Sequence, residues 1–280
     1  MKQAMIFAAG LGTRLKPLTD TMPKALVRVG GQPLLWHVIM KLKAAGFERI
    51  VVNVHHFAQQ IVDYLKENDN FGLDIRISDE SDGLLETGGG IKKALPLFDQ
   101  ESPVLIHNVD ILSNVDLNFL YGFAASTAAV DADIDALLLV SQRKTKRYLL
   151  FDDELILRGW INIETGEVRD HRGTVPMCSA GSAHRGQSPS DLGRQPSSDL
   201  RQLAFSGIHV IGPSAFPYFE EMPERFGIID FYLKYCQQCS FLGYEKADLR
   251  LLDVGKLDSL EQAESFLKLN NVGKNWSNLW

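Results

Sequence analysis

Short apolar runs alternate with segments of helical periodicity through the first half of the chain. Four runs have the apolar or alternating pattern of strands, and they cover residues 4–9, 49–54, 74–78 and 104–108. Three intervening segments space their apolar residues as helices do, and they lie over residues 33–45, around 61–65 and over 91–95. This alternation predicts an α/β fold with a Rossmann-like, mostly parallel mixed sheet that is flanked by helices.

The second half of the chain is less regular. Residues 148–152 and 155–161 predict a hairpin, and a further turn is expected at Thr165–Gly166. Residues 179–200 are rich in Ser, Gly and Pro, which predicts a loop with no core of its own. Regular structure is expected again in a strand and two helices, at 204–210, 228–238 and 257–269. We therefore expect one domain over residues 1–280 that carries an irregular hairpin and loop insertion.

Composition narrows the class of protein. Hydrophobic residues make up 45% of the 280 and charged residues 23%, which is typical of a globular chain. No run of about eighteen apolar residues occurs, so no membrane-spanning helix is expected. Three cysteines are too few for a disulfide framework, which favours the cytoplasm. The net charge of -6 argues against a protein that coats nucleic acid, and the acidic cluster at residues 79–82 predicts a solvated loop.

The first thirty residues depart from this acidic balance, because basic residues there outnumber acidic ones. The charged residues of this stretch are Lys2, Arg14, Lys16, Asp20, Lys24 and Arg28. On charge alone, a solvated positive surface is the favoured interpretation. Local capture of a small anionic ligand is the alternative.

A glycine-rich loop follows the first predicted strand. Gly10 and Gly12 let the backbone turn sharply and direct its N–H groups at a ligand, which suits phosphate oxygens. Two familiar phosphate loops are excluded. The P-loop requires a lysine where Thr13 stands, and the dinucleotide fingerprint requires a third glycine where Leu15 stands.

This loop resembles the N-terminal signature of the sugar-1-phosphate nucleotidyltransferases, small-Gly-x-Gly-Thr-Arg-Leu-x-Pro-Leu-Thr followed by Pro-Lys. The chain matches that signature at residues 9–19 and at Pro23-Lys24. Four further motifs of the family agree, and they are Glu86-Thr87-Gly88-Gly89-Gly90, Asn108-x-Asp110, Phe205-Ser206-Gly207 and Asp253-Val254-Gly255. Within this superfamily the chain is most similar to N-acetylmuramate-1-phosphate uridylyltransferases and to mannose-1-phosphate guanylyltransferase-type proteins. The resemblance implies a GT-A-like nucleotidyltransferase fold.

The same resemblance implies an enzyme that transfers a nucleoside monophosphate from a nucleoside triphosphate, UTP first, to a sugar 1-phosphate. The products are a nucleoside-diphosphate sugar and pyrophosphate. Arg14 and Lys24 are the implied catalytic cations, and Ser206 and Gly207 line the implied sugar site. The implied nucleotide-binding residues are Ala9, Gly10, Leu11, Gly12, Thr13, Glu86, Gly88 and Gly89.

Mg²⁺ is the implied cofactor, with Asp110 and Asp253 as its ligands. Magnesium reaches proteins through one or two carboxylates and completes its shell with phosphates and water. Each aspartate lies just beyond an apolar run, and ligands in such sheets gather where strands end, so we expect the two to converge. Capping of a helix or turn would account for either residue alone. No general base is required, because a phosphomonoester with a second pKa near ~6 is mostly dianionic at neutral pH.

Departures from the family pattern leave the sugar open. Val109 stands where the family usually has glycine, Tyr148-Leu149 where many have Tyr-Gly, and Lys256 where threonine is usual. The Glu-Lys-Pro segment of many relatives is also absent from residues 158–162.

Several functions compete with uridylyl transfer. Guanylyl transfer to mannose 1-phosphate and CTP-dependent cytidylyl transfer are the nearest alternatives. A nucleotide-binding regulator without turnover is an alternative of another class, and a nicotinamide-dependent oxidoreductase is disfavoured by Leu15. The expected partners are the triphosphate and the sugar phosphate, with no nucleic acid and no membrane, and no oligomeric state follows from the sequence.

Overall fold

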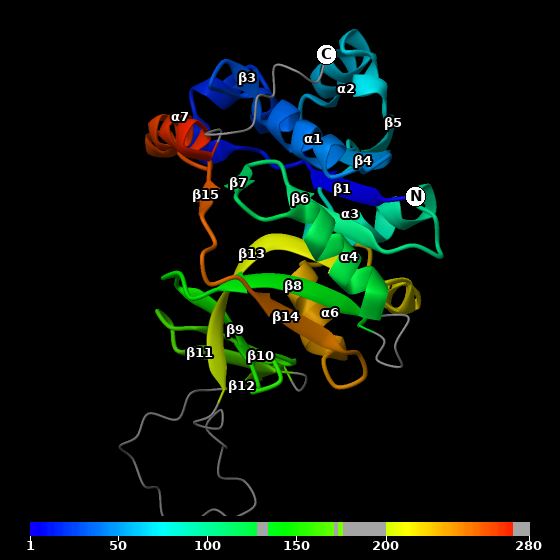
Figure 1. Cartoon of the computed structure of the whole chain (residues 1–280), viewed down its shortest axis with the longest axis vertical. Helices are drawn as coiled ribbons and strands as arrows, with labels where there is room; N and C mark the ends of the chain where they lie inside the picture. The colour runs from blue at the N-terminus through cyan, green and yellow to red at the C-terminus, as the bar shows by residue number, and fades with distance from the viewer. Residues whose placement is uncertain (128–133, 171–172, 176–199, 271–280) are drawn as a thin grey trace, which may run out of the picture.

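A twisted sheet runs through the middle of the molecule, with seven strands in the order β5–β4–β1–β6–β13–β8–β14 (Figure 1). The computed structural model describes residues 1–127, 134–170, 173–175 and 200–270. The strands are β1 (Gln3–Phe7), β4 (Arg49–Val54), β5 (Asp74–Asp79), β6 (Val104–Asn108), β8 (Ala136–Ser141), β13 (Arg201–Ile211) and β14 (Phe241–Glu245). Strand β1 is parallel to β4 and β6, β4 to β5, and β8 to β14, whereas β13 is antiparallel to β6 and β8. The predicted α/β fold with a mixed, mostly parallel central sheet is confirmed.

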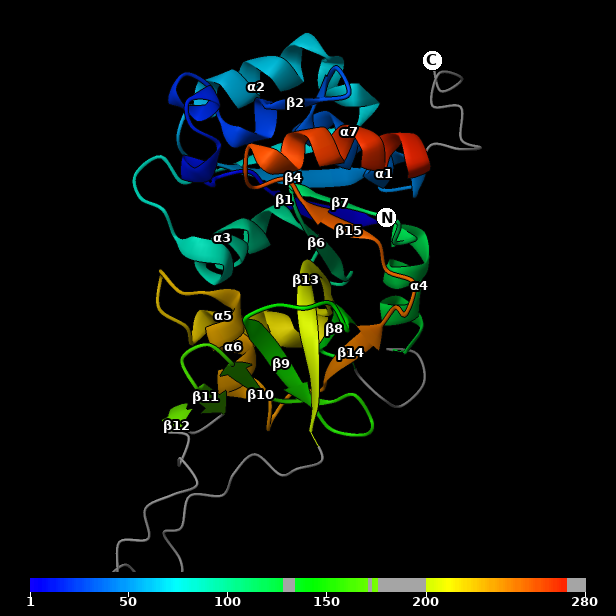
Figure 2. The same ribbon diagram turned by 90° about the vertical axis from the view of Figure 1, so that its left-hand side faces the viewer.

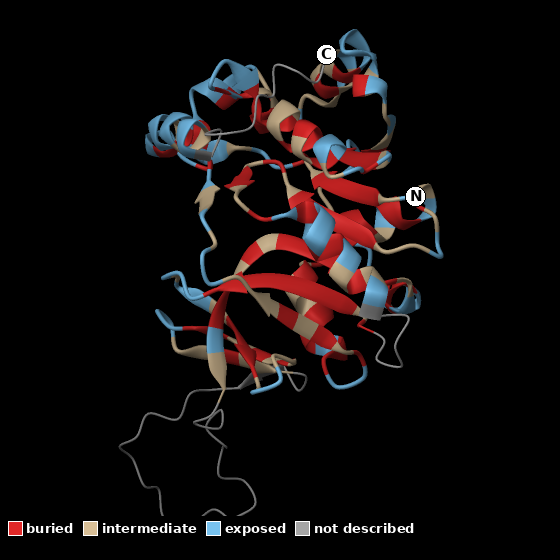
Figure 3. Cartoon of the chain, viewed as in Figure 1, coloured by how far each residue is buried: buried red, intermediate tan, exposed pale blue. Residues whose placement is uncertain are grey.

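Helices cover both faces of this sheet (Figure 2). Four pack on one face: α1 (Leu34–Ala44), α2 (Ala58–Glu67), α4 (Leu117–Thr127) and α7 (Asp258–Asn270). Three pack on the other: α3 (Glu86–Ala94), α5 (Phe216–Glu220) and α6 (Ile228–Tyr235). Strands β1, β4 and β8 are buried almost throughout (Figure 3), which is why they read as continuous apolar runs. None of the described helices is long and apolar enough to cross a membrane.

The hairpin predicted in the second half of the chain is confirmed. Strand β9 (Arg147–Phe151) pairs antiparallel with β10 (Leu157–Asn162), and β11 (Glu167–Asp170) and β12 (Gly173–Val175) continue the ladder. Strand β9 also pairs with the first residues of β13, which joins this antiparallel extension to the central sheet. The loop predicted at 179–200 lies outside the described residues, apart from Leu200.

Two small ladders and six short 3-10 helices complete the described structure. The ladders pair β7 (Ile111–Ser113) with β15 (Leu251–Asp253), and β2 (Arg28–Val29) with β3 (Gln32–Pro33). The 3-10 helices are η1 (Thr13–Leu15), η2 (Leu18–Asp20), η3 (Lys24–Leu26), η4 (Asp69–Gly72), η5 (Leu95–Leu97) and η6 (Pro213–Ala215). The β7–β15 ladder matters for function, because Asp110 precedes β7 and Asp253 is the last residue of β15.

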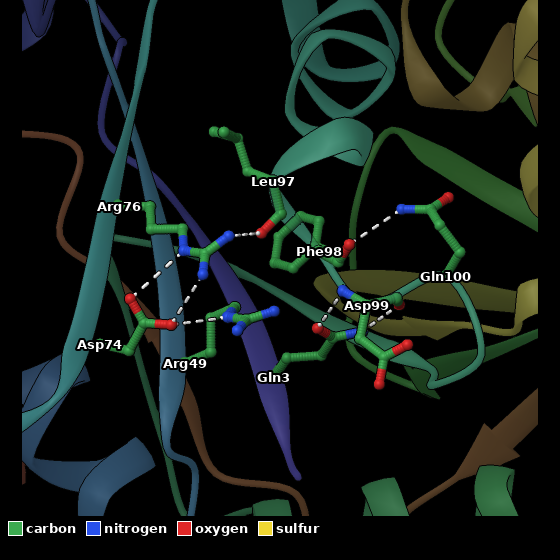
Figure 4. A network of polar contacts seen from close by, with 8 residues as sticks. All are labelled: Gln3, Arg49, Asp74, Arg76, Leu97, Phe98, Asp99 and Gln100. Atoms are coloured by element: carbon green, nitrogen blue, oxygen red, sulfur yellow. Dashed lines mark hydrogen bonds and ion pairs between the residues drawn. The ribbon is translucent and has the colours of Figure 1, made fainter.

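Side-chain hydrogen bonds tie the strands together at the end where β1, β4 and β5 begin (Figure 4). The side-chain amide of Gln3 donates to the carbonyl of Asp99 at 2.8 Å and accepts from its N–H at 2.9 Å. Asp74 accepts from Arg49 at 2.7 Å and from Arg76 at 3.2 Å. These contacts stabilise one end of the parallel strands, while the loops at the other end are free to carry chemistry.

Candidate active site

The glycine loop after β1 has a conformation that requires glycine at one position. Gly12 lies in the left-handed region at φ +63°, and a Cβ there would stand 2.9 Å from Cγ2 of Thr19. Thr19 donates its hydroxyl to the carbonyl of Gly12 at 2.8 Å, which fixes the turn. Gly10 differs, since a Cβ would meet nothing within 4 Å. Among the described residues, no acceptor is found for the N–H groups of Gly10 and Leu11, so both are available to an anion.

The side chains of Asn53 and Glu80 form hydrogen bonds that fix the start of this loop. The sequence analysis singled out neither residue as part of the site. The Asn53 side-chain oxygen accepts from the N–H of Ala8 at 2.7 Å and from that of Ala9 at 3.3 Å. Its amide donates to Glu80 at 2.7 Å, and Glu80 also accepts from the N–H of Leu85 at 3.1 Å. The Ala9 amide therefore already has a protein acceptor. The prediction of a solvated loop at 79–82 is wrong for Glu80, which is fully buried because it serves this network.

Lys24 and Asp110 form an ion pair beside the loop. Lys24 opens η3 directly after Pro23, and only 10% of its side chain is exposed. A Cβ on Gly12 would lie 3.1 Å from Cβ of Lys24, so the glycine turn and the lysine are packed together. The sequence motif thus brings a largely buried cation next to the carboxylate that was predicted to bind metal.

Asp110 and Asp253 come together through backbone pairing. In the β7–β15 ladder Asp253 lies opposite Ile111, and the N–H of Val254 donates to the carbonyl of Asp110 at 2.8 Å. Partial removal from water and the negative charge of Asp110 raise the pKa of Asp253, while Lys24, Arg14 and Arg143 oppose the shift. The two carboxylates are therefore close enough to repel each other.

The Arg14 guanidinium and the Asp253 carboxylate both lie beside Gly255. A Cβ on Gly255 would stand 2.6 Å from Oδ1 of Asp253 and 2.8 Å from Nη2 of Arg14, so both groups crowd one glycine. Gly255 is buried and leaves the space that the guanidinium occupies. Arg14 and Lys24 of the N-terminal motif thus meet Asp110 and Asp253, which lie far from them in the sequence.

This donor set fits a divalent cation. Asp110 and Asp253 supply the hard carboxylate oxygens that magnesium prefers, and their mutual repulsion is relieved when a cation lies between them. Among the described residues, no group of three or more His, Cys, Asp and Glu side chains converges as a metal site.

The glycines of α3 have a packing role. The N–H groups of Gly88 and Gly89 donate to the carbonyl of Phe226 at 2.9 and 3.1 Å. A Cβ on Gly88 would stand 2.2 Å from the Phe226 ring, and one on Gly89 would stand 2.2 Å from the carbonyl oxygen of Glu224. The helix therefore begins at Glu86, five residues before the prediction, because tertiary packing here accepts glycine in a helix. Nucleotide binding by Glu86, Gly88 and Gly89 stays a prediction.

Ser206 and Gly207 form an irregularity in β13. The register between β13 and β8 shifts between Phe205 and His209, and Ser206 Oγ accepts from the N–H of Ile208 at 3.0 Å. Gly207 has φ +78°, and a Cβ there would stand 2.5 Å from the Asn108 side-chain nitrogen. The predicted sugar residues thus lie next to the Asn108-x-Asp110 motif, and sugar binding itself stays a prediction.

Val109 does not face the site. Its side chain is 4% exposed and belongs to the core that also contains Ala8, Leu15 and Val254. Its N–H donates to the carbonyl of Phe7 at 3.1 Å, so the backbone continues the β1–β6 pairing. The valine that replaces the usual glycine therefore fills the interior.

Arg143 is a further cation that sequence reasoning missed. It follows β8, is exposed, and donates from Nη2 to the carbonyl of Phe205 at 2.8 Å. Partial removal from water lowers the pKa of Arg143, whereas the charges of Asp253 and Tyr148 raise it. None of the motifs found in the sequence contains this residue, and the strand that positions it, β8, was not predicted either, so the sequence carried no signal for it.

Comparison with known proteins agrees with this geometry. Residues 3–148 match the family described as nucleotidyl transferase. The chain belongs to this family. It is 46% identical over 125 residues to an N-acetylmuramate alpha-1-phosphate uridylyltransferase of Neisseria meningitidis serogroup B, a match that covers 44% of the chain and 53% of the relative. A protein of the same name from Caulobacter vibrioides is 51% identical over 111 residues, which are 39% of the chain and 46% of that relative. The chain thus spans about half the length of the curated relatives it matches.

Solved structures share the fold of this chain over nearly its full length. A putative glucose-1-phosphate thymidylyltransferase from Bacillus anthracis, in complex with a sucrose, aligns with a TM-score of 0.72 at 16% identity over 98% of both chains. HddC from Yersinia pseudotuberculosis, complexed with GMP-PN, aligns with a TM-score of 0.65 at 20% identity over 95% of this chain and 100% of that one. The expected GT-A-like nucleotidyltransferase fold is therefore confirmed.

Proposed function

We propose that the protein transfers a nucleoside monophosphate from a nucleoside triphosphate to a sugar 1-phosphate, releasing pyrophosphate. The observation that carries this proposal is the meeting of Arg14, Lys24, Asp110 and Asp253 beside the Gly12 turn. UTP is the first triphosphate to test and N-acetylmuramate 1-phosphate the first acceptor, because the relatives from Neisseria meningitidis and Caulobacter vibrioides carry those names. A reaction that consumes nucleoside triphosphates belongs in the cytoplasm.

The triphosphate binds to the N-terminal loop. The N–H groups of Gly10 and Leu11 point to phosphate oxygens, and the Thr13 and Gly12 backbone shapes the turn around them. Arg14 binds the β- and γ-phosphates, for which a planar guanidinium offers paired hydrogen bonds. Glu86 and the residues that begin α3 border the nucleoside side.

The acceptor attacks without a general base. Its phosphate oxygen is already mostly ionised at neutral pH and forms a bond to the α-phosphorus, while the bond between that phosphorus and the bridging oxygen of the β-phosphate breaks. The electron pair leaves with pyrophosphate. Lys24 neutralises charge that develops at the α-phosphate, and Ser206 and Gly207 border the sugar.

Asp110 and Asp253 are the residues that would hold Mg²⁺. A bound magnesium ion would neutralise phosphate charge and orient the triphosphate chain. Asp110 is paired with Lys24 in this structure. The same pairing keeps the Lys24 ammonium beside the glycine loop, where the α-phosphate would lie.

A pyrophosphate-release screen tests the proposal. UTP, GTP, CTP and dTTP are each combined with N-acetylmuramate, glucose and mannose 1-phosphates, with Mg²⁺ and with EDTA. We expect release for one triphosphate with one sugar 1-phosphate, and none with EDTA. If no combination releases pyrophosphate but a nucleotide binds tightly, the alternative of a nucleotide-binding regulator without catalytic activity would be favoured.

A further inference from the structure

Arg143 lies between the N-terminal loop, which carries Arg14 and Lys24, and the irregular part of β13 at Ser206–Gly207. Its guanidinium donates to the carbonyl of Phe205, at the residue where β13 begins to depart from regular pairing. Two residues on, Gly207 lies against the side chain of Asn108, and Asn108-x-Asp110 leads to the ion pair with Lys24. Arg143 thus belongs to the Ser206–Gly207 side of the site, whereas Arg14 and Lys24 come from the N-terminal loop.

The negative charges of Asp110 and Asp253 would repel an incoming phosphate, so a third cation is favoured beside them. A phosphate that approaches Asp110 and Asp253 meets two carboxylates, one of which is already partnered by Lys24. Arg14 lies beside Gly255, whereas Arg143 follows β8 and contacts β13, so the two cations reach Asp253 from different segments. The described residues accept a single hydrogen bond from Arg143, which leaves the other N–H donors of this exposed side chain for a ligand.

A cavity of about 380 Å³ lies next to the residue that precedes Arg143, and Arg143 itself does not line it. Gln142, which precedes Arg143, lines it together with Tyr148, Arg201, Gln202 and Leu203. Arg201 and Gln142 both contact Glu245, which holds the polar wall in place. The cavity offers hydrogen-bonding groups to a hydroxyl-rich or amide-bearing molecule whose charged end lies at Arg143.

We propose that Arg143 binds the phosphate of the acceptor sugar while the body of the sugar lies in this cavity. The inference rests on the proposed transfer to a sugar 1-phosphate and assigns the acceptor subsite within it. The guanidinium offsets the repulsion between the acceptor phosphate and the two carboxylates, and its planar donors suit a phosphate. Arg143 therefore governs acceptor affinity, whereas triphosphate affinity depends on the N-terminal loop.

The test compares Arg143→Gln with Lys144→Gln. Glutamine can still donate to the Phe205 carbonyl, so Arg143→Gln removes the charge and keeps the structural contact. Lys144 is an exposed neighbour, so its variant controls for the loss of one positive charge nearby. With UTP and N-acetylmuramate 1-phosphate, we expect Arg143→Gln to raise KM for the acceptor about 10- to 100-fold. KM for UTP should change less than about twofold, and Lys144→Gln should change neither.

A binding measurement separates this inference from the proposed function. Titration calorimetry of both variants and the unaltered protein uses N-acetylmuramate 1-phosphate and the sugar without phosphate. We expect Arg143→Gln to weaken the binding of N-acetylmuramate 1-phosphate and to leave the affinity for the sugar without phosphate unchanged. Failure of the unaltered protein to release pyrophosphate would reject the proposed function. Equal acceptor affinity in Arg143→Gln and the unaltered protein, or an equal loss for UTP, would overturn the role of Arg143.

Discussion

Lys24 and Asp110 form an ion pair in which 10% and 17% of the two side chains are exposed. Removing one partner of such a pair leaves the other charge with little water to solvate it. Lys24→Ala should therefore bind magnesium more readily at the carboxylates and yet turn over poorly. We expect kcat to fall about 100- to 1,000-fold with KM for the triphosphate nearly unchanged, because the lysine acts on charge that develops in the transition state. Steady-state kinetics decide this, with the exposed Lys16→Ala as control. A large rise in KM alone would assign Lys24 to ground-state binding.

Asp253→Asn should separate stability from activity. Because Asp110 and partial removal from water raise the pKa of Asp253, its ionised form is disfavoured in the folded state, and stability falls as pH rises through that pKa. We expect the amide variant to be slightly more stable at pH 7, by less than about 1 kcal/mol since the side chain is exposed, and equally stable near pH 3. Turnover should be lost, and Mg²⁺ should raise the melting temperature of the unaltered protein alone. A variant that is less stable at pH 7 would contradict the repulsion.

Asp110→Asn should affect stability differently from Asp253→Asn. The variant leaves the largely buried Lys24 without its ion-pair partner, so it should be less stable than the unaltered protein, although an amide of the same shape keeps the fold. Turnover should disappear, because the predicted metal loses the carboxylate nearest to the catalytic lysine. Circular dichroism and pyrophosphate release measure the two effects. Retained activity would mean that the ion binds elsewhere.

Sequence reasoning located the parts of this fold whose signals are local. The strands at 49–54 and 104–108 were predicted within their observed bounds, because buried parallel strands are continuously apolar. The prediction missed α4, β8 and β14, where apolar runs lacked clear boundaries. It also began α3 five residues late, because an isolated Gly-Gly-Gly run disfavours a helix and the compensating contact with Phe226 lies about 140 residues away.

The site divides in the same way. Gly12, Arg14 and Lys24 lie in one continuous motif, so the sequence could suggest that they act together. Asn53 and Glu80 carry no such signal, because a buried polar pair reads along the chain as an ordinary strand residue and an ordinary acidic loop. Their importance follows only from the three-dimensional contact with the Ala8–Ala9 backbone.

Gly88 and Gly122 should respond oppositely to alanine, although both are helical glycines. A Cβ on Gly88 would overlap the Phe226 ring at 2.2 Å, whereas one on Gly122 would meet nothing within 4 Å. Gly88→Ala should lower the free energy of unfolding by about 1–3 kcal/mol through overpacking. Gly122→Ala should raise it by up to about 1 kcal/mol through helix propensity. Urea denaturation measures both, and equal effects of the two substitutions would refute a packing role for Gly88.

Acid should unfold this protein well before its carboxylates are protonated. His107 and His209 are almost fully buried, and burial lowers the pKa of each from 6.5 to about 3. The unfolded chain therefore takes up protons below pH 6.5 that the folded chain refuses, so stability is complete above that pH and falls toward pH 3. Between pH 7 and pH 5 each histidine should cost about 2 kcal/mol of unfolding free energy. His209→Gln, which can keep a hydrogen bond with Tyr232, should reduce this loss by about 2 kcal/mol in urea titrations, while the exposed His56→Gln should leave it unchanged. Parallel pH profiles for His209→Gln and the unaltered protein would show that His209 takes up its proton without unfolding.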